Sequence, residues 1–494
     1  MMKLAEVLQN ISCIYQKKKD AETVVSGIVF DSRQVQPGDL FVCITGMNTD
    51  GHRFVPQAVA KGAAAVLAEH EVELPENADV AVAIVKDTRQ AMAQAAAAFY
   101  RYPSRRLRLI GVTGTNGKTT TTWLIRSILE YWGKKTGVMG TIRTMIDDVE
   151  ADASRTTPEA PDIEKFLALC CQHRAEYAVM EVSSHALSLG RVQCMQYRQA
   201  IFTNLTQDHL DYHHTMEAYC QAKCELFRMV QPAPGNVCIV NRDDPFAESF
   251  IQAAKAPVIT CSLHSGADLF VKDLQMNAAG TSFLFVWKEK SYPVHMKLVG
   301  DFNVHNALSA IASALCEGVP PETIREALCH VEGVPGRFQP VAEGQDYAVI
   351  VDYAHTPDGL ENILQTGKKL VQNRLITVFG CGGDRDSTKR PIMGEIAARY
   401  SDRVIVTSDN PRSEEPEAII RQIVAGIKKE NYEIVPDRRQ AIEKAIGMAQ
   451  PGDLVMIAGK GHETYQLVKD QVLHFDDVEV ARAYIRERAG KYYK

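Results

Sequence analysis

The hydrophobic pattern of the chain alternates short apolar runs with amphipathic stretches. Apolar runs at residues 107–112, 177–182 and 201–205 are typical of buried parallel strands. A helical pattern follows the first run, with Leu124 and Ile128 on one apolar face. Strands that alternate with helices in this way predict an α/β fold with parallel sheets.

The same alternation is found on both sides of this stretch. Toward the N-terminus it predicts strands at residues 24–30, 40–44 and 63–68, and helices at residues 54–61 and 88–100. Toward the C-terminus, residues 300–306 open a further helix, with Asn303 as the candidate cap. Additional strands are predicted at residues 348–353, 375–379, 404–407 and 454–458.

The length of the chain and two joints predict its domains. A chain of 494 residues favours about three domains. Proline-containing stretches at residues 102–106 and 335–337 are candidate boundaries. We therefore expect a smaller N-terminal α/β domain at residues 1–105, a central domain with a parallel sheet at residues 106–335, and a C-terminal α/β domain at residues 336–494.

Composition and charge exclude several classes of protein. The net charge of −6 gives no basic signal for nucleic acid or for an anionic membrane. The apolar stretches are too short to span a bilayer, and at the N-terminus basic residues follow the apolar ones, which is the wrong order for a signal peptide. Twelve scattered cysteines are typical of reduced thiols. We expect a cytoplasmic protein without membrane insertion.

Two patterns point weakly to other kinds of site. Cys220 and Cys224 lie four positions apart, close to His213 and His214, but they lack the spacing of a zinc site. The glycines at residues 380–385 lack the third glycine of a dinucleotide-binding fingerprint. The sequence therefore favours neither zinc nor a dehydrogenase.

The strand at residues 107–112 runs into a glycine-rich loop, and the helix follows directly. Strand, loop, Lys-Thr and helix form a P-loop, although Val112 stands where the strict pattern has glycine. Backbone N–H groups at the helix start would hold phosphates, Lys118 would reach the outer phosphates, and Thr119 would bind Mg²⁺. The predicted ATP-binding residues are Gly114, Thr115, Asn116, Gly117, Lys118, Thr119 and Thr120.

Polar residues at neighbouring strand ends could complete this site. Glu181 ends one predicted strand, and a carboxylate there can hold Mg²⁺. His209 follows another strand and could share the metal, and a loop with Thr156 and Thr157 could reach the same crevice. Lys223 lies on a predicted helix at residues 215–227, where the residues alone favour a lysine that extends to the surface.

The predicted C-terminal strands also end in polar, glycine-rich loops, at residues 380–385, 408–412 and 459–463. Ligands of open parallel sheets bind beyond the carboxyl ends of the strands. These three loops therefore predict a second binding face.

Five segments together resemble the Mur ligase family: residues 113–120, 181–185, 203–211, 352–355 and 459–463. With a loop at residues 31–33, the similarity covers nearly the whole chain. It implies an N-terminal domain for a uridine nucleotide, a central P-loop ATPase and a C-terminal Rossmann-like domain for an amino acid. The order and spacing of the segments resemble members that extend UDP-N-acetylmuramoyl-L-Ala-D-Glu, an early step of peptidoglycan synthesis.

The resemblance also implies residue roles. Asn306, Arg337 and His355 would line the ATP site. The lysine at position 223 matches the family lysine that CO₂ carbamylates, so that it could hold Mg²⁺ with Thr119, Glu181 and His209. The implied catalytic residues are Lys118, Glu181, His209 and Lys223. The implied contacts of the UDP-linked substrate are Ser32, Thr156, Thr157, Ser183 and Arg191; Leu189 stands where some relatives have glutamine.

The Asp-Asn-Pro-Arg loop is similar to the signature of members that use meso-diaminopimelate rather than L-lysine. Diaminopimelate carries a second amino-acid head, whose carboxylate Arg412 could bind through two hydrogen bonds. With lysine as substrate, Arg412 would stay buried without a partner, at a cost of about 1–3 kcal/mol. The implied diaminopimelate-binding residues are Arg385, Asp409, Asn410, Pro411, Arg412, Gly459 and Glu463.

The resulting hypothesis is an ATP- and Mg²⁺-dependent amide ligase that works through an acyl phosphate and closes about the joint at residues 335–337. Three alternatives stay open. The enzyme could use L-lysine, it could be a sister ligase such as MurF or a folylpolyglutamate synthetase, or it could be a nucleotide-driven switch without ligation. We expect a monomer, and no sequence feature identifies a protein partner.

Overall fold

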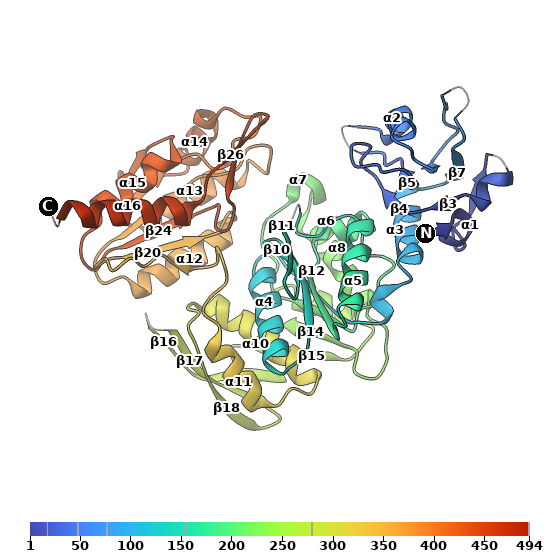
Figure 1. Cartoon of the computed structure of the whole chain (residues 1–494). Coiled ribbons are helices and arrows are strands. Elements are labelled where there is room, and N and C mark those ends of the chain that lie inside the picture. Colours follow the sequence, from blue (N-terminus) through green and yellow to red (C-terminus); the bar gives the residue numbers. More distant parts are fainter. Residues whose placement is uncertain (17, 47–48, 76–77, 153–154, 278–279, 493–494) are drawn as a thin grey trace.

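The computed structural model describes residues 1–16, 18–46, 49–75, 78–152, 155–277 and 280–492. The chain forms an N-terminal domain (blue in Figure 1), a central domain (cyan to yellow) and a C-terminal domain (orange to red). Each has its own α/β sheet, which confirms the predicted fold class. Their exact boundaries stay a prediction. In the described part of the chain, no helix has both the length and the apolar character that crossing a membrane requires.

The N-terminal domain contains a small, mostly parallel sheet. Its strand order is β2 (Cys13–Tyr15), β7 (Ala81–Val85), β6 (Ala65–Ala68), β5 (Asp39–Val42) and β4 (Gly27–Val29). The helices are α1 (Leu4–Val7), α2 (Val55–Ala60) and α3 (Thr88–Phe99). The single strand expected at residues 24–30 is wrong. The chain is interrupted at Ser26, whose backbone N–H donates to the carbonyl of Gly38. As a result β4 stays in this sheet, whereas β3 (Val24–Val25) pairs with β1 (Met2–Lys3) outside it.

The central sheet has a parallel core with helices on both faces. The core order is β9 (Thr136–Met139), β12 (Tyr177–Glu181), β8 (Arg108–Thr113), β13 (Gln199–Phe202), β14 (Val237–Asn241) and β15 (Val258–Ser262). One apolar layer lies under α4 (Lys118–Tyr131), α10 (Asp301–Cys316) and α11 (Pro321–His330). The other lies under α5 (Ala160–Gln172), α8 (Met216–Met229) and α9 (Ala247–Ala253). The short helices α6 (Ser184–Ser188) and α7 (Leu210–His213) follow β12 and β13.

Further strands extend both ends of this sheet, and the sequence analysis did not predict them. They are β10 (Arg143–Ile146), β11 (Val149–Asp152), β16 (Leu269–Asn277), β17 (Gly280–Trp287) and β18 (Lys290–Met296). They extend the sheet through antiparallel pairs, except that β16 joins β15 in parallel.

Two predicted details of the central domain are wrong. The strand expected at residues 201–205 begins and ends earlier, because Thr203 and Asn204 leave the sheet to bond the P-loop. The helix cap expected at Asn303 is Gly300 instead. Asn303 lies inside the helix, where its amide donates to the carbonyl of Val299.

The C-terminal sheet has the order β19 (Gln339–Pro340), β20 (Ala348–Asp352), β24 (Leu454–Ala458), β21 (Leu375–Phe379), β22 (Arg403–Val406) and β23 (Tyr432–Ile434). Strands β20 to β23 run parallel. One face packs on α12 (Pro357–Leu370), α13 (Lys389–Tyr400) and α14 (Pro416–Val424). The other packs on α15 (Arg438–Met448) and α16 (Asp477–Tyr492). A hairpin of β25 (Tyr465–Val468) and β26 (Gln471–His474) follows β24.

Candidate active site

A cavity of about 360 Å³ lies where the central and C-terminal domains meet. The P-loop and the carboxyl ends of β12 and β13 line it from the central domain. The loops after β20, β21, β22 and β24 line it from the C-terminal domain. Strand ends of two parallel sheets thus face one space, which is the usual position of ligands in such sheets.

The P-loop has the backbone geometry that the sequence predicts. Helix α4 begins at Lys118, and Gly117 before it has a φ of 84°. A side chain at Gly117 would strike the amide oxygen of Asn306. The loop is also held from β13, because the N–H of Asn116 donates to Asn204 Oδ1 at 2.9 Å and that of Thr115 to the Asn204 carbonyl at 2.8 Å. Sequence reasoning missed this supporting asparagine.

The side chain of Lys118 folds over its own loop. Its Nζ donates to the carbonyl oxygens of Gly114 at 2.9 Å and Thr115 at 2.8 Å. Burial lowers the pKa of Lys118, and the nearby charge of Arg337 lowers it further, although Glu181 acts in the opposite direction. An anionic phosphate in the loop would raise the pKa of Lys118 again and favour its ammonium form.

Two oxygen donors near Lys118 fit a hard divalent cation. Glu181 is buried at the end of β12, where its two carboxylate oxygens accept from the N–H of Thr141 at 2.7 Å and from its hydroxyl at 2.9 Å. Thr119 also lines the cavity. Carboxylate and hydroxyl oxygens with free lone pairs suit Mg²⁺. Thr141 was not predicted.

Asp208 is a further cavity residue that sequence reasoning did not assign. Its Oδ1 lies 3.6 Å from Lys389 Nζ, and its Oδ2 lies 3.4 Å from His209 Nε2 and 4.0 Å from His355 Nε2. Burial alone would raise the pKa of Asp208, but these three neighbours hold it well below its usual range. Burial lowers the pKa of His209 to about 3 and that of His355 to about 4, so both rings are neutral near pH 7.

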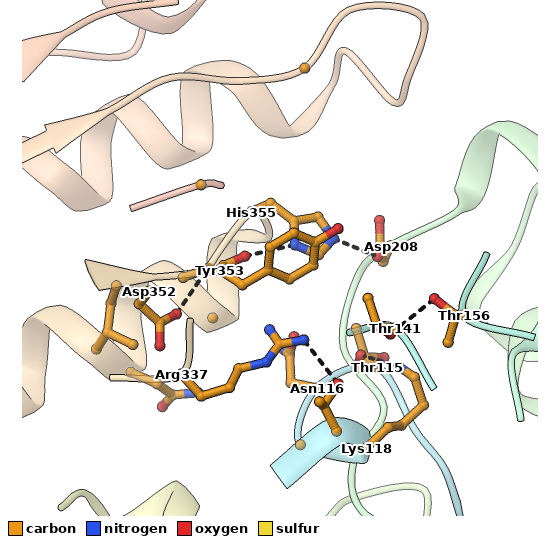
Figure 2. A pocket seen from close by; sticks show the side chains of 18 of the residues that line it. Thr115, Asn116, Lys118, Thr141, Thr156, Asp208, Arg337, Asp352, Tyr353 and His355 are labelled. Carbon is orange, nitrogen blue, oxygen red and sulfur yellow. Dashed lines mark hydrogen bonds and ion pairs between the residues drawn. The ribbon is translucent and has the colours of Figure 1, made fainter. Parts of the chain in front are cut away.

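Arg337 crosses from the C-terminal domain to the P-loop, as Figure 2 shows. Its guanidinium donates to Thr119 Oγ1 at 2.9 Å and lies 4.6 Å from the ring centre of Tyr353. A second link joins Asn116 Nδ2 to Asp358 Oδ2 at 2.9 Å. The joint predicted at residues 335–337 therefore supplies a residue to the nucleotide side of the cavity.

Lys223 corrects the prediction from the residues alone, which placed it at the surface. It is 1% exposed and donates to the Gly114 carbonyl at 2.8 Å. Burial and the charge of Lys118 lower the pKa of Lys223 well below its usual value. This environment favours the uncharged, nucleophilic form of the amine. This environment depends on how α8 packs against the P-loop, which the periodicity of the helix does not reveal.

The residues expected to contact the UDP-linked substrate fall into two places. Thr156 lines the cavity and bonds the Thr141 hydroxyl at 3.1 Å. Thr157, Ser183 and Arg191 form a neighbouring group, in which the hydroxyl of Thr157 accepts from the N–H of Ser183 and its carbonyl accepts from Arg191, both at 3.0 Å. Ser32 lies apart in the N-terminal domain, where it donates to Gln57 Oε1 at 2.8 Å.

Arg412 differs in one respect from its prediction. It lines the cavity, but it is partly exposed and already donates to the Gly383 carbonyl at 2.7 Å. A substrate without a second carboxylate would therefore not leave Arg412 wholly unpartnered, because its backbone partner and solvent remain. Arg385 is exposed at the rim, and its side chain donates to the Asp384 carbonyl at 2.8 Å.

The described residues thus bring most of the predicted site together. The predicted residues that line the cavity are Thr115, Asn116, Gly117, Lys118, Thr119, Thr120, Thr156, Glu181, His209, Asn306, Arg337, His355, Arg385, Asp409, Asn410, Arg412, Gly459 and Glu463. The predicted residues that lie outside this lining are Ser32, Gly114, Thr157, Ser183, Arg191, Lys223 and Pro411.

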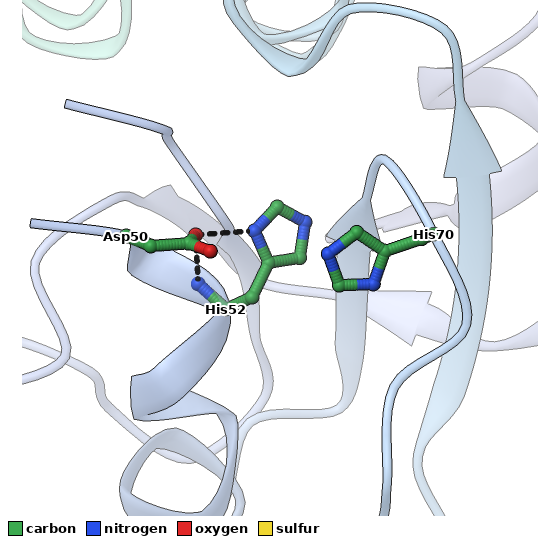
Figure 3. A group of neighbouring side chains, drawn as sticks. All are labelled: Asp50, His52 and His70. Carbon is green, nitrogen blue, oxygen red and sulfur yellow. Dashed lines mark hydrogen bonds and ion pairs between the residues drawn. The ribbon is translucent and has the colours of Figure 1, made fainter.

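A separate group of possible metal ligands lies in the N-terminal domain (Figure 3): Asp50, His52 and His70. Both nitrogens of the His52 ring are already bonded. Nδ1 lies 2.6 Å from Asp50 Oδ1, and Nε2 accepts from the N–H of Glu69 at 3.0 Å. If a metal were bound at Nδ1, the ring proton would have to sit on Nε2. That N–H would then point at the backbone N–H of Glu69, and two donors would face each other. The arrangement fits a histidine held in one tautomer better than a metal site.

Family models match most of the chain. The Mur ligase family catalytic domain matches residues 24–100, the Mur ligase middle domain matches residues 112–314, and the Mur ligase glutamate ligase domain matches residues 336–461.

Similar proteins and structures carry related names. A UDP-N-acetylmuramoyl-L-alanyl-D-glutamate–2,6-diaminopimelate ligase from Syntrophomonas wolfei is 53% identical over 98% of this chain and 99% of its own length. One from Geobacillus kaustophilus is 47% identical over 99% of this chain and 100% of its own. A solved structure of a ligase with this name has a TM-score of 0.68 at 35% identity and covers 99% of both chains. MurF from Thermotoga maritima in complex with ADP has the same fold, with a TM-score of 0.65 at 19% identity over 97% of this chain and 100% of that structure.

Proposed function

Because this chain belongs to the Mur ligase family, we propose that it is an ATP-dependent ligase that joins meso-2,6-diaminopimelate to UDP-N-acetylmuramoyl-L-alanyl-D-glutamate, with release of ADP and phosphate. The observation that carries the proposal is the single cavity shared by the P-loop and the Asp409–Arg412 loop. The P-loop side of this cavity suits a nucleoside triphosphate, and the side of the Asp409–Arg412 loop suits a zwitterionic amino acid. Full-length relatives with the diaminopimelate ligase name support the same reaction.

The first step would convert a poor electrophile into a good one. A carboxylate oxygen of the D-glutamate side chain attacks the γ-phosphorus of ATP, the bond to the β-phosphate oxygen breaks, and ADP leaves. The product is an acyl phosphate. The P-loop N–H groups and Lys118 would offset the charge of the transferring phosphoryl group. Arg337, which lies within hydrogen-bond distance of Thr119, supplies a second cation from the other domain.

The donor set of the cavity supports a magnesium site. Thr119 and Glu181 are oxygen donors close to Lys118, and the neutral ring of His209 offers a nitrogen. A bound Mg²⁺ supplies charge neutralisation on the phosphate oxygens. Thr141 holds both oxygens of Glu181 and so would fix its orientation.

Lys223 is proposed to carry a carbamate. Its uncharged amine can attack the carbon of CO₂ and lose a proton, which turns a buried lysine into an anion. The anion would lie close to Lys118, whose positive charge already lowers the pKa of Lys223. The charge of Lys118, which disfavours the protonated form of Lys223, would attract the carbamate.

The second step would form the amide. The uncharged amine of diaminopimelate attacks the acyl carbon and loses a proton, and the bond from that carbon to the phosphate oxygen breaks as phosphate leaves the tetrahedral intermediate. The bridging contacts from Arg337 and Asn116 hold the two domains together over the cavity, which favours exclusion of water from the acyl phosphate. Arg385 at the rim is proposed to bind the carboxylate beside the reacting amine.

The distal amino-acid head of diaminopimelate, which is the one that does not react, would bind to the loops after β22 and β24. Arg412 still has N–H groups to offer beyond the one bonded to Gly383. They can bind the distal carboxylate, while Asp409 and Glu463 receive the distal ammonium group. The whole set proposed for this amino acid also includes Asn410, Pro411 and Gly459. L-Lysine lacks the distal carboxylate, so it would lose the bond to Arg412.

The test is phosphate release from MgATP with UDP-N-acetylmuramoyl-L-Ala-D-Glu, comparing meso-diaminopimelate with L-lysine. We expect release that depends on both the UDP-linked substrate and diaminopimelate. Equal efficiency with lysine would overturn the proposed amino-acid preference. Phosphate release that needs neither the UDP-linked substrate nor an amino acid would instead indicate a nucleotide-driven switch. The expected monomeric state and cytoplasmic location stay predictions.

A further inference from the structure

A buried lysine stands directly behind the proposed amino-acid site. Lys460 follows the end of β24 and is 0% exposed. Its Nζ donates to Glu463 Oε2 at 3.0 Å and to Asn410 Oδ1 at 3.1 Å. It is not among the cavity-lining residues. An ammonium group this deeply buried is costly unless each of its donors is used, so its position calls for an explanation.

The hydrogen bonds of Lys460 fix the orientation of both partners. Asn410 Oδ1 accepts from Lys460 and also from the N–H of Leu467, at 2.9 Å. Asn410 Nδ2 donates to Glu463 Oε2 at 2.8 Å. The amide of Asn410 therefore has one allowed orientation. Glu463 Oε2 receives two donors, and because Glu463 also lines the cavity, its other carboxylate oxygen can serve a ligand there.

The charges around Lys460 lead to the same conclusion. Asp409 and Glu463 are two carboxylates close together, and burial together with Asp409 raises the pKa of Glu463. Lys460 opposes this shift as the nearest cation. Without it, one of the two carboxylates would be driven to take up a proton, and the site would lose part of its attraction for an ammonium group.

We propose that Lys460 is a positioning residue for diaminopimelate: it holds Asn410 and Glu463 in place, so that Glu463, beside Asp409, can receive the distal ammonium group. The inference rests on the proposed function and deepens it. Lys460 acts through its two neighbours and does not touch the substrate. Lys460 should therefore affect the binding of diaminopimelate but not that of ATP or the UDP-linked substrate.

The experiment replaces Lys460 by methionine, which keeps most of the side-chain volume and removes the charge. We expect the KM for diaminopimelate to rise about 10- to 100-fold, while the KM values for ATP and the UDP-linked substrate stay within about twofold. Lys469→Met is the matched control, because Lys469 lies exposed on the adjoining turn, where its side chain pairs with Glu415 at the surface. An unchanged KM for diaminopimelate, or an equal rise of all three, would overturn the proposal.

A double-mutant cycle keeps the test decisive if Lys460→Met folds poorly. The comparison uses a Glu463→Gln background, in which adding Lys460→Met completes the removal of the buried charge pair. Removing both partners is milder than removing one of them. If Lys460 acts through Glu463, adding Lys460→Met to this background changes the KM for diaminopimelate by no more than about twofold. If the double variant instead raised the KM for diaminopimelate by the product of the two single-variant effects, the proposal would be overturned. Wild-type enzyme is assayed first: failure to use diaminopimelate there overturns the proposed function, and this inference with it.

Discussion

The two sides of the cavity are built in different ways. The nucleotide side comes mainly from one continuous segment, β8 to α4, and its main contacts are backbone groups: Lys118 on two loop carbonyls and Asn204 on two loop N–H groups. The amino-acid side is assembled from the ends of β21, β22 and β24 and from the hairpin after them. There, charged side chains hold the loops in place.

Among the residues that the structure describes, the amino-acid side contains three buried cations outside the cavity lining. Arg390 pairs with Glu414 at 2.8 Å behind the loop after β21. Arg438 pairs with Asp477 at 2.7 Å and donates to the carbonyl of Ala458 at the end of β24. Lys460 is the third. A backbone-built site tolerates changes around it, whereas a site held by side chains changes its selectivity when one of them is lost. We therefore expect mutations to affect chemistry on the first side and substrate choice on the second.

The largest effect is expected on the nucleotide side. Replacing Lys118 by alanine removes the cation nearest the transferring phosphoryl group, and we expect kcat to fall by about 1000-fold or more. Binding of the UDP-linked substrate should stay nearly unchanged, because its proposed contacts lie elsewhere. Phosphate release and calorimetric titration of the UDP-linked substrate measure the two quantities. Near-wild-type turnover would contradict the proposed ligase mechanism.

Removal of CO₂ tests the second lysine of this side. In degassed, bicarbonate-free buffer the proposed carbamate on Lys223 would be lost, and we expect turnover to fall by about 10- to 100-fold and to recover when bicarbonate is added. Lys223→Ala should be equally slow and should not respond to bicarbonate. A carbon-13 signal from labelled bicarbonate, absent in that variant, reports the modification directly. Equal activity with and without CO₂ would exclude a functional carbamate.

On the amino-acid side we expect a selective effect. Arg412→Ala removes a charge-assisted contact to the distal carboxylate, so the KM for diaminopimelate should rise about 10- to 100-fold. The KM for ATP should change little, and the preference for diaminopimelate over lysine should shrink. Steady-state kinetics with both amino acids measure this. The matched control is Arg421→Ala, on an exposed part of α14. Unchanged selectivity would assign Arg412 a structural role.

The same contrast explains what could be predicted from the sequence. The P-loop was predicted because its signals are local: an apolar strand, two glycines that need unusual backbone geometry, and a helix start. The sequence indicated the strand-end loops, but not how Lys460 ties Asn410 to Glu463, because those three residues come from two separate loops. Packing alone reveals the burial of Lys223 against Gly114. The interdomain pair of Asp208 and Lys389 also depends on long-range contact.

The smallest effect is expected from a substitution at Gly336, in the joint between the two sides, and Gly344 provides its matched control. Gly336 has a φ of 65°, and a Cβ there would strike the backbone of Gly461 and His462. Its neighbour Arg337 reaches the P-loop, so this turn contacts both sides of the cavity. Gly344 has a φ of 87° but has open space around it. Both alanine variants carry backbone strain of about 1–2 kcal/mol.

Only Gly336→Ala must also displace the loop that carries Lys460. We therefore expect it to lower the free energy of unfolding by about 1–3 kcal/mol more than Gly344→Ala does, and to raise the KM for diaminopimelate as well. Chemical denaturation and steady-state kinetics of the two variants separate strain from contact. If the two variants were equally stable, the turn at Gly336 would be free to move, and the loop behind the amino-acid site would not depend on it.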